Sequence, residues 1–247
     1  MDDVLIARMN DLAHRAVKTG SAASKFLTPA EAQRVAQDFA RRKDVTLTLD
    51  GAYSGAERSC AIFTNPDWGE YNRDELFAVL KIAKRPQDSL GHRDVLGALM
   101  GLGIKREAIG DIIIHEEFAG LICLSEMAVY ISENLTKAGR VGITLSEISL
   151  DALPACEEAL AIKTDTVASM RLDAIVSSAF GMSRAKAAEL INAGRVNLNH
   201  QICTKTDKDV AETAIISIRG MGRAKLLEIA GVSKKGRNFI KIGIYSR

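Results

Sequence analysis

The sequence predicts an α+β protein made of three small domains, at residues 1–74, 75–150 and 166–247. With 247 residues, 47% of them hydrophobic, the chain can bury a sizeable core, and its length favours several small domains over one. Helical spacing and strand alternation follow one another along the whole chain. The formal net charge is only +2, yet residues 163–247 hold 15 lysines and arginines against 7 acids, whereas the first 162 residues carry 18 against 24. A basic domain attached to an acidic body is typical of a protein that binds a polyanion.

The first domain is expected to combine two helices with two strands. Residues 1–19 place apolar side chains at helical spacing. A second helix should begin at Thr28-Pro29-Ala30-Glu31, which offers a capping Thr, a Pro in the first turn and a reciprocal Glu, and should run to about Lys43. Residues 45–49 and 60–63 then read as strands.

A loop between these two strands holds Tyr53, Glu57 and Arg58 among small residues. Tyr53 could pack inward beside a local Glu57–Arg58 pair, or the loop could contact a partner. The sequence leaves both interpretations open.

The middle domain is expected to have the ferredoxin-like order of strand, helix, two strands, helix and strand, which RNA-recognition motifs share. The segments are residues 76–82, 92–100, 111–115, 118–124, 127–138 and 141–145. RNA-recognition motifs stack bases on aromatic side chains of their central strands, and this segment offers little beyond Phe118 in that role. We therefore favour a structural or protein-contact role for this sheet.

The third domain should begin with two short helices and continue as strands. The first helix carries apolar side chains from Leu172 to Ala179 and ends at Gly181, and Ser183 caps the second. Gly194 suits the left-handed position that ends a helix, and residues 195–199 alternate as a strand. Further strands are expected at 214–218 and 240–245.

Basic side chains gather in this third domain. Arg184 and Lys186 stand in the first turn of a helix, where cations are locally unfavourable, so an external anion is expected to offset them. Basic residues separated by glycines in the expected loops at 219–225 and 234–238 would let the backbone approach phosphates closely. The candidate phosphate contacts are Arg184, Lys186, Arg195, Lys205, Arg219, Arg223, Lys225, Lys234, Lys235 and Arg237. The candidate organisers of the local fold are Arg171, Asp173, Ser183, Gly194 and Asn197.

This third domain resembles the RNA-binding domain named after the small-subunit ribosomal protein S-four, also called the αL motif. The resemblance rests on the ordered set Arg171-Leu172-Asp173, Ser183-Arg184, Leu190-Ile191 and Gly194-Arg195-Val196-Asn197. One departure is visible. Where the family commonly turns with Asn-Gly, this chain has Asn199-His200, which places the turn geometry in question.

Further motifs lie upstream of the third domain. They are Phe26-Leu27-Thr28-Pro29, Gly55-Ala56-Glu57-Arg58, residues 89–94, 96–99 and 101–107, and Ile109-Gly110-Asp111-Ile112. With these motifs nearly the whole chain is similar to the YlmH-like family of bacterial RNA-binding proteins. That resemblance implies association with the large ribosomal subunit carrying tRNA, contact with rRNA or tRNA, a role in rescue or quality control of stalled translation and, in some bacteria, a link to cell division.

The sequence also bears on two other classes of function. An RNA-modifying enzyme is disfavoured because Met170-Arg171-Leu172-Asp173 opens the RNA-binding domain itself, unlike the catalytic motif of pseudouridine synthases, and Gly220-x-Gly222 lacks the third glycine of a methyltransferase-type cofactor loop. A protein-interaction adaptor for the division machinery is the other class. We expect a noncatalytic, cytoplasmic, monomeric protein without membrane segment, cofactor or metal, whose scattered cysteines are free thiols.

Overall fold

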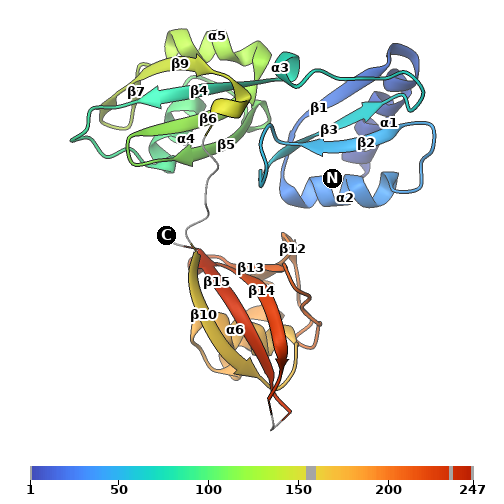
Figure 1. Cartoon of the computed structure of the whole chain (residues 1–247), viewed down its shortest axis with the longest axis vertical. Coiled ribbons are helices and arrows are strands. Elements are labelled where there is room, and N and C mark those ends of the chain that lie inside the picture. Colours follow the sequence, from blue (N-terminus) through green and yellow to red (C-terminus); the bar gives the residue numbers. More distant parts are fainter. Residues whose placement is uncertain (1, 154–159, 234–235, 246–247) are drawn as a thin grey trace. The chain divides into compact units, whose positions relative to one another are not determined.

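A computed structural model describes residues 2–153, 160–233 and 236–245. The chain forms two compact units, residues 1–156 and 157–247, and each is described by itself (Figure 1). Both units combine helices with antiparallel strands, which confirms the α+β class. No helix within these described ranges combines the length and the apolar character needed to cross a membrane.

The first unit opens with a three-stranded antiparallel sheet in the order β1-β3-β2. Two helices pack on it around Met9, Val35 and Phe63. The predicted capping box of the second helix is present: Thr28 Oγ1 accepts from the Glu31 backbone at 3.3 Å, and the Thr28 backbone donates to the Glu31 carboxylate at 2.7 Å. The elements are α1 (Asp2–Thr19), β1 (Ser21–Leu27), α2 (Pro29–Phe39), β2 (Thr46–Asp50) and β3 (Ser59–Thr64).

The same unit continues as a four-stranded sheet in the order β5-β6-β4-β9, which confirms the predicted ferredoxin-like order. Two parts of the expectation were wrong. Helix α5 ends at Asn134, where a β7–β8 hairpin takes over, and the last strand lies at 144–148 instead of 141–145. The elements are α3 (Arg73–Leu76), β4 (Phe77–Ala83), α4 (His92–Gly101), β5 (Ile109–Ile114), β6 (Phe118–Leu124), α5 (Ser125–Asn134), β7 (Lys137–Ala138), β8 (Val141–Gly142) and β9 (Thr144–Ile148), with 3-10 turns at Arg106–Ala108 and Leu150–Ala152.

Arg58 joins the two sheets of the first unit. It exposes only 9% of its surface, and its guanidinium donates to the carbonyl oxygens of Ile109 and Phe26 at 3.0 Å each. Burial lowers the pKa of Arg58. From the same loop, Tyr53 donates to the Asp111 carboxylate at 3.0 Å. The structural interpretation of this loop is therefore correct for Tyr53 but wrong for Arg58, which is buried between the two sheets and does not belong to a surface element.

The sheet face of the ferredoxin-like part does not present Phe118 as an open platform. The His115 ring stacks on Phe118 with centroids 4.5 Å apart, and the Lys81 ammonium lies 5.0 Å from the same ring. Further along β6, Leu153 lies so close to Gly120 that a Cβ there would meet it at 2.5 Å. The chain's own side chains thus fill much of the face that would stack bases.

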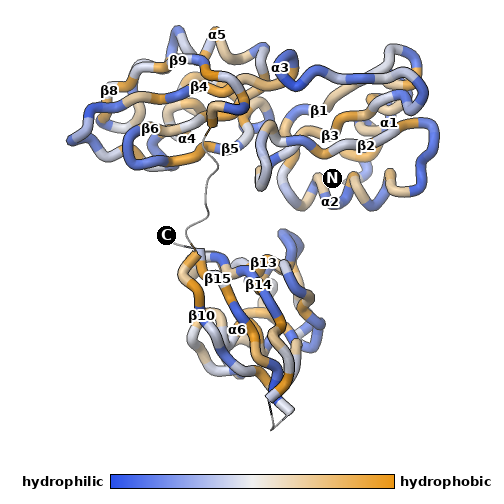
Figure 2. The backbone as a smooth tube through the Cα atoms, in the orientation of Figure 1, coloured by the Kyte–Doolittle hydropathy of each residue, from blue (hydrophilic) through white to orange (hydrophobic). Residues whose placement is uncertain are grey.

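The second unit is one six-stranded antiparallel sheet, in the order β10-β15-β14-β13-β11-β12, with two helices packed on one face. Figure 1 shows α6 behind the long strands β10, β14 and β15, and Figure 2 shows hydrophobic segments along these strands. The elements are β10 (Leu160–Val167), α6 (Leu172–Phe180), α7 (Arg184–Asn192), β11 (Val196–Leu198), β12 (Gln201–Ile202), β13 (Ile215–Ile218), β14 (Gly222–Val232) and β15 (Asn238–Tyr245). Strand β10 begins at Leu160, six residues before residue 166, where the sequence placed the start of the third domain.

The Asn199-His200 turn keeps the geometry that Asn-Gly would give. Asn199 has φ 48° and His200 φ 67°, and positive φ at both central residues defines the two-residue hairpin turn of type I′. The Asn199 side-chain oxygen also accepts from the Ile215 backbone at 2.9 Å. This bond holds Asn199 in the left-handed region, which Asn tolerates better than most residues.

Candidate nucleic-acid interface

The start of α7 is built by local hydrogen bonds. Gly181 adopts φ 64° and ends α6, as predicted. The Ser177 hydroxyl donates to the Met182 carbonyl at 2.6 Å, which closes the turn. Ser183 then caps α7 by accepting from the Lys186 backbone at 3.2 Å. The turn therefore fixes where the first residues of α7 project.

Asp173 anchors the cations at this helix start. Its side chain is 9% exposed and accepts from Arg184 at 2.8 Å and from Arg171 at 3.2 Å. Burial by itself would raise the pKa of Asp173, but the two guanidinium groups outweigh it and lower the pKa. Arg184 stays half-exposed. Asp173 thus holds Arg184 in place while leaving part of its guanidinium open to solvent.

The other two helix-associated cations differ from Arg184. Lys186 is exposed and pairs with Glu189 one turn further along, at 2.8 Å. Arg195 follows Gly194, which has φ 66°, and the Arg195 backbone donates to the Leu190 carbonyl at 3.0 Å. This is the bonding of a Schellman motif, and it leaves the Arg195 side chain exposed.

A loop covers the start of α6. The backbone amides of Leu172 and Asp173 donate to the carbonyls of Lys208 and Thr206 at 2.8 and 3.1 Å. These two backbone amides at the start of α6 therefore donate to carbonyls of the covering loop and are not free to bind a phosphate. Lys205 lies exposed on the covering loop. Asn197 lies in β11, half-buried and opposite Ile202 and Ser217.

Arg223 and Lys225 lie in strand β14, so the expectation of a loop at 219–225 was wrong beyond residue 221. Ala224 between them is buried in the core under the helices, and alternation therefore turns both cations toward the opposite face of the sheet. There the Arg223 guanidinium lies 4.6 Å from the Tyr245 ring. Arg219 is exposed in the β13–β14 turn. The structure thus separates these cations from those of α7.

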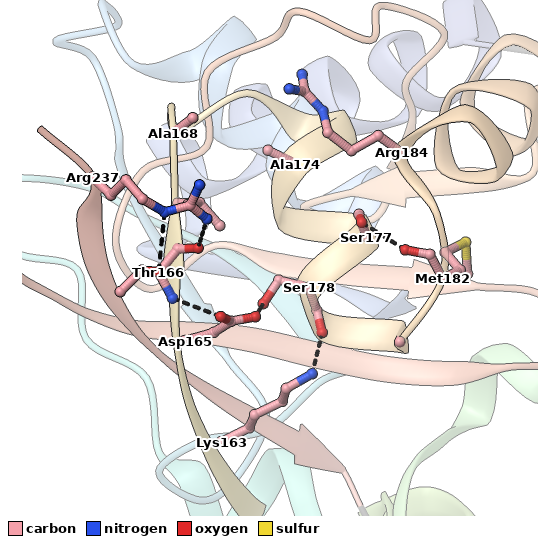
Figure 3. Close-up of a pocket in the computed structure, with 12 residues that line it drawn as sticks. Lys163, Asp165, Thr166, Ala168, Ala174, Ser177, Ser178, Met182, Arg184 and Arg237 are labelled. Carbon is pink, nitrogen blue, oxygen red and sulfur yellow. Dashed lines mark hydrogen bonds between the residues drawn. The ribbon is translucent and has the colours of Figure 1, made fainter. Parts of the chain in front are cut away.

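A groove of about 370 Å³ brings Arg237 toward Arg184. Figure 3 shows the two guanidinium groups on different sides of the groove, and Lys163 at its lower end. Arg237 donates to Thr166 Oγ1 at 3.1 Å. Lys163, which donates to the Ser178 carbonyl at 2.5 Å, was missed because β10 was not predicted. Lys234 and Lys235 lie outside the described residues.

Among the described residues, no group of three or more His, Cys, Asp or Glu side chains is placed to hold a metal ion. The candidate interface is instead a set of exposed arginines and lysines around α7, the covering loop and the groove. Such a set can neutralise RNA phosphates, but contacts to phosphates do not distinguish one nucleotide sequence from another.

Comparisons with known proteins agree with this architecture. Residues 77–152 match the family described as the putative RNA-binding domain in YlmH, and residues 170–216 match the S4 domain. The Bacillus subtilis protein named ribosome-associated protein quality control protein P2 is 36% identical over 216 residues, which cover 86% of this chain and 82% of that protein. A solved structure, cell division protein ylmH from Streptococcus pneumoniae, matches with a TM-score of 0.51 and 17% identity, covering 62% of this chain and 93% of its own. The chain belongs to the YlmH-like family of RNA-binding proteins, and its second unit carries the S4 domain of that family.

Proposed function

We propose that this chain is a noncatalytic ribosome-associated protein that binds structured RNA, rRNA or tRNA on the large subunit, in rescue or quality control of stalled translation. The single observation that carries the proposal is Arg184, held by the buried Asp173 at the start of α7 while half of it remains exposed. A pre-positioned guanidinium loses less conformational entropy when it binds a phosphate.

Two further facts support the ribosomal partner. The Bacillus subtilis relative is named as a ribosome-associated quality control protein. Three arginines of the S4-type unit, Arg184, Arg195 and Arg219, also lie at short turns closed by the chain's own hydrogen bonds, which suits recognition of a folded RNA by its shape.

The noncatalytic part of the proposal rests on Asp173. In a catalytic role this carboxylate would need to meet a substrate. Here it is 9% exposed and engaged by both Arg171 and Arg184. An enzyme would leave a modified nucleoside that disappears on deletion of the gene, and an unchanged nucleoside profile is expected.

The test is cosedimentation of the full chain with large ribosomal subunits. Replacing Arg184, Lys186 and Arg195 together by Ala is expected to abolish cosedimentation, because three phosphate contacts and their counterion release are lost. Circular dichroism should show an intact fold, because the three side chains are exposed.

A matched control removes the same charge elsewhere. Arg8, Arg15 and Lys18 are exposed on α1, and their triple Ala variant should cosediment like the wild type. Equal losses in the two triple variants would show that net charge alone governs binding, and undiminished binding by the α7 variant would refute the proposed surface. Nuclease treatment should release the protein, whereas a division-machinery adaptor would keep its partners.

A further inference from the structure

The groove in the S4-type unit is rimmed by cations that come from three separate elements. Lys163 belongs to β10, Arg184 to the start of α7, and Arg237 directly precedes β15. These residues are far apart in the sequence, yet all three line one hollow of about 370 Å³ (Figure 3). That volume lies within the usual range of small-molecule sites.

The inside of the groove differs chemically from its rim. Ala168 and Ala174 give it small apolar walls, and Ser177 contributes a hydroxyl. Asp165 is the acidic group in this set, and its carboxylate accepts from the Ser178 hydroxyl at 2.6 Å and from the Thr166 backbone at 2.7 Å. The groove therefore pairs a cationic rim with an interior that offers apolar contact and hydrogen-bond acceptors.

A single nucleotide is chemically complementary to this arrangement. Its phosphate is anionic, its base has an apolar face, and the edge of the base carries N–H donors. A base inside a duplex cannot reach such a hollow. It must leave its stack, which costs a few kcal/mol in a paired strand and least where the base is already unpaired.

We propose that this groove binds a single unpaired nucleotide that is turned out of a structured RNA, with its phosphate between Arg184 and Arg237 and its base against Ala168 and Ala174. The inference rests on the proposed RNA binding and adds to it the RNA feature that the unit reads. Lys163 donates to the Ser178 carbonyl and closes the far end of the groove.

Asp165 gives the groove a preference among ligands. The hydrogen bond from Ser178 lowers the pKa of Asp165, outweighing its burial, so the carboxylate is ionised at neutral pH. An ionised carboxylate only accepts hydrogen bonds. The edge of a base that faces Asp165 must therefore present N–H donors, and a second phosphate would be repelled.

The test fills the groove without changing any charge. Ala168 is exposed and lines the groove, so Ala168→Phe should occupy it and leave the core intact. Ala161→Phe, at an exposed position of β10 outside the groove lining, is the matched control. The probes for the full-length chain are an RNA hairpin with one bulged guanosine, whose base edge presents N–H donors, and the same hairpin fully paired. Ala168→Phe should weaken binding of the bulged hairpin about tenfold or more and leave the paired hairpin unchanged, and Ala161→Phe should affect neither.

A second measurement uses the wild-type chain, so it does not depend on how a variant folds. With 6-thioguanosine at the bulge, ultraviolet crosslinks should map to peptides containing residues 163–184. Crosslinks confined to other peptides, or equal effects of Ala168→Phe on both hairpins, would overturn the groove assignment while leaving RNA binding intact. If the wild-type chain bound neither hairpin nor ribosomes, the proposed function itself would fail.

Discussion

Replacing Asp173 by asparagine isolates the ion pairs that hold the start of α7. Breaking a fully buried pair costs about 3–5 kcal/mol, and an exposed pair is worth about 0–1 kcal/mol. Asp173 is 9% exposed but Arg184 is 52% exposed, so the guanidinium can turn to water when its partner is lost. Asparagine also keeps the shape and one acceptor oxygen. We therefore expect a loss of about 1–2 kcal/mol in the free energy of unfolding of the second unit.

The assay is thermal and urea unfolding of the full chain, with Asp207→Asn as the control. Asp207 is exposed on the covering loop, so the control makes the same charge change and should cost less than about 0.5 kcal/mol. Each kcal/mol should lower the midpoint temperature of a unit of this size by about 4–8 °C. Equal stability of the two variants would refute the anchoring role of Asp173.

The RNA affinities of Asp173→Asn and Asp207→Asn distinguish an effect of the position of Arg184 from an effect of net charge. Both substitutions remove one negative charge from the second unit, so a purely electrostatic surface would bind RNA equally or more tightly in both. Only the loss of a fixed Arg184 makes Asp173→Asn bind more weakly than Asp207→Asn. Affinity should be measured at one salt concentration, because counterion release makes it steeply salt-dependent.

The pH dependence has a definite sign. The folded state lowers the pKa of Asp173, so its contribution to stability is fully present above the unfolded value of about 3.9 and is lost as pH falls through the folded pKa. The stability difference between wild type and Asp173→Asn should be constant from about pH 7 to 5 and shrink below about pH 4. A difference that grows on acidification would contradict this linkage.

Two further predictions concern the first unit. Arg58→Met should destabilise that unit by about 2–4 kcal/mol, because buried carbonyls lose charged donors, whereas Arg93→Ala at an exposed position should be nearly neutral in the same unfolding assay. An equal effect of the two would exclude the bridging role of Arg58. Burial raises the pKa of the Cys60 and Cys123 thiols to about 12, so neither should react with iodoacetamide at pH 8 in the folded chain, as peptide mass spectrometry can measure. Labelling of both at the rate of a free thiol would show that the core opens readily.

The elements predicted from sequence are those whose local signals and tertiary packing agree. The capping box at Thr28, the end of the helix at Gly181, the left-handed Gly194 and the ferredoxin-like strand order are all confirmed. Strand β1 was missed because Ser21-Ala22-Ala23-Ser24-Lys25 does not alternate. Its pairing with β3 overrides weak local propensity.

The candidate site could be predicted as a set of residue types but not as a surface. Charge pattern and motif found Arg184, but the ion pair of Lys186 with Glu189 depends on side-chain conformation, which no spacing determines. The glycines around Arg223 suggested a loop, whereas pairing with β13 and β15 makes it a strand. The groove escaped prediction because it needs β10, whose residues Lys163 and Asp165 meet α6 only in the folded chain.

The Arg58 bridge also has a consequence for how the protein can be divided. Its guanidinium donates to the carbonyl of Phe26 in the first sheet and to those of Ile109 and Arg106 in the part that follows, so a cut near residue 75 would leave this buried cation with Phe26 alone among these three acceptors. A fragment ending there should be poorly soluble, because Phe26 would also lose its ring contact with Phe77, 5.5 Å between centroids. Fragments for expression are better divided between residues 156 and 157, at the boundary of the two compact units. The smallest fragment that keeps these contacts therefore contains both sheets of the first unit.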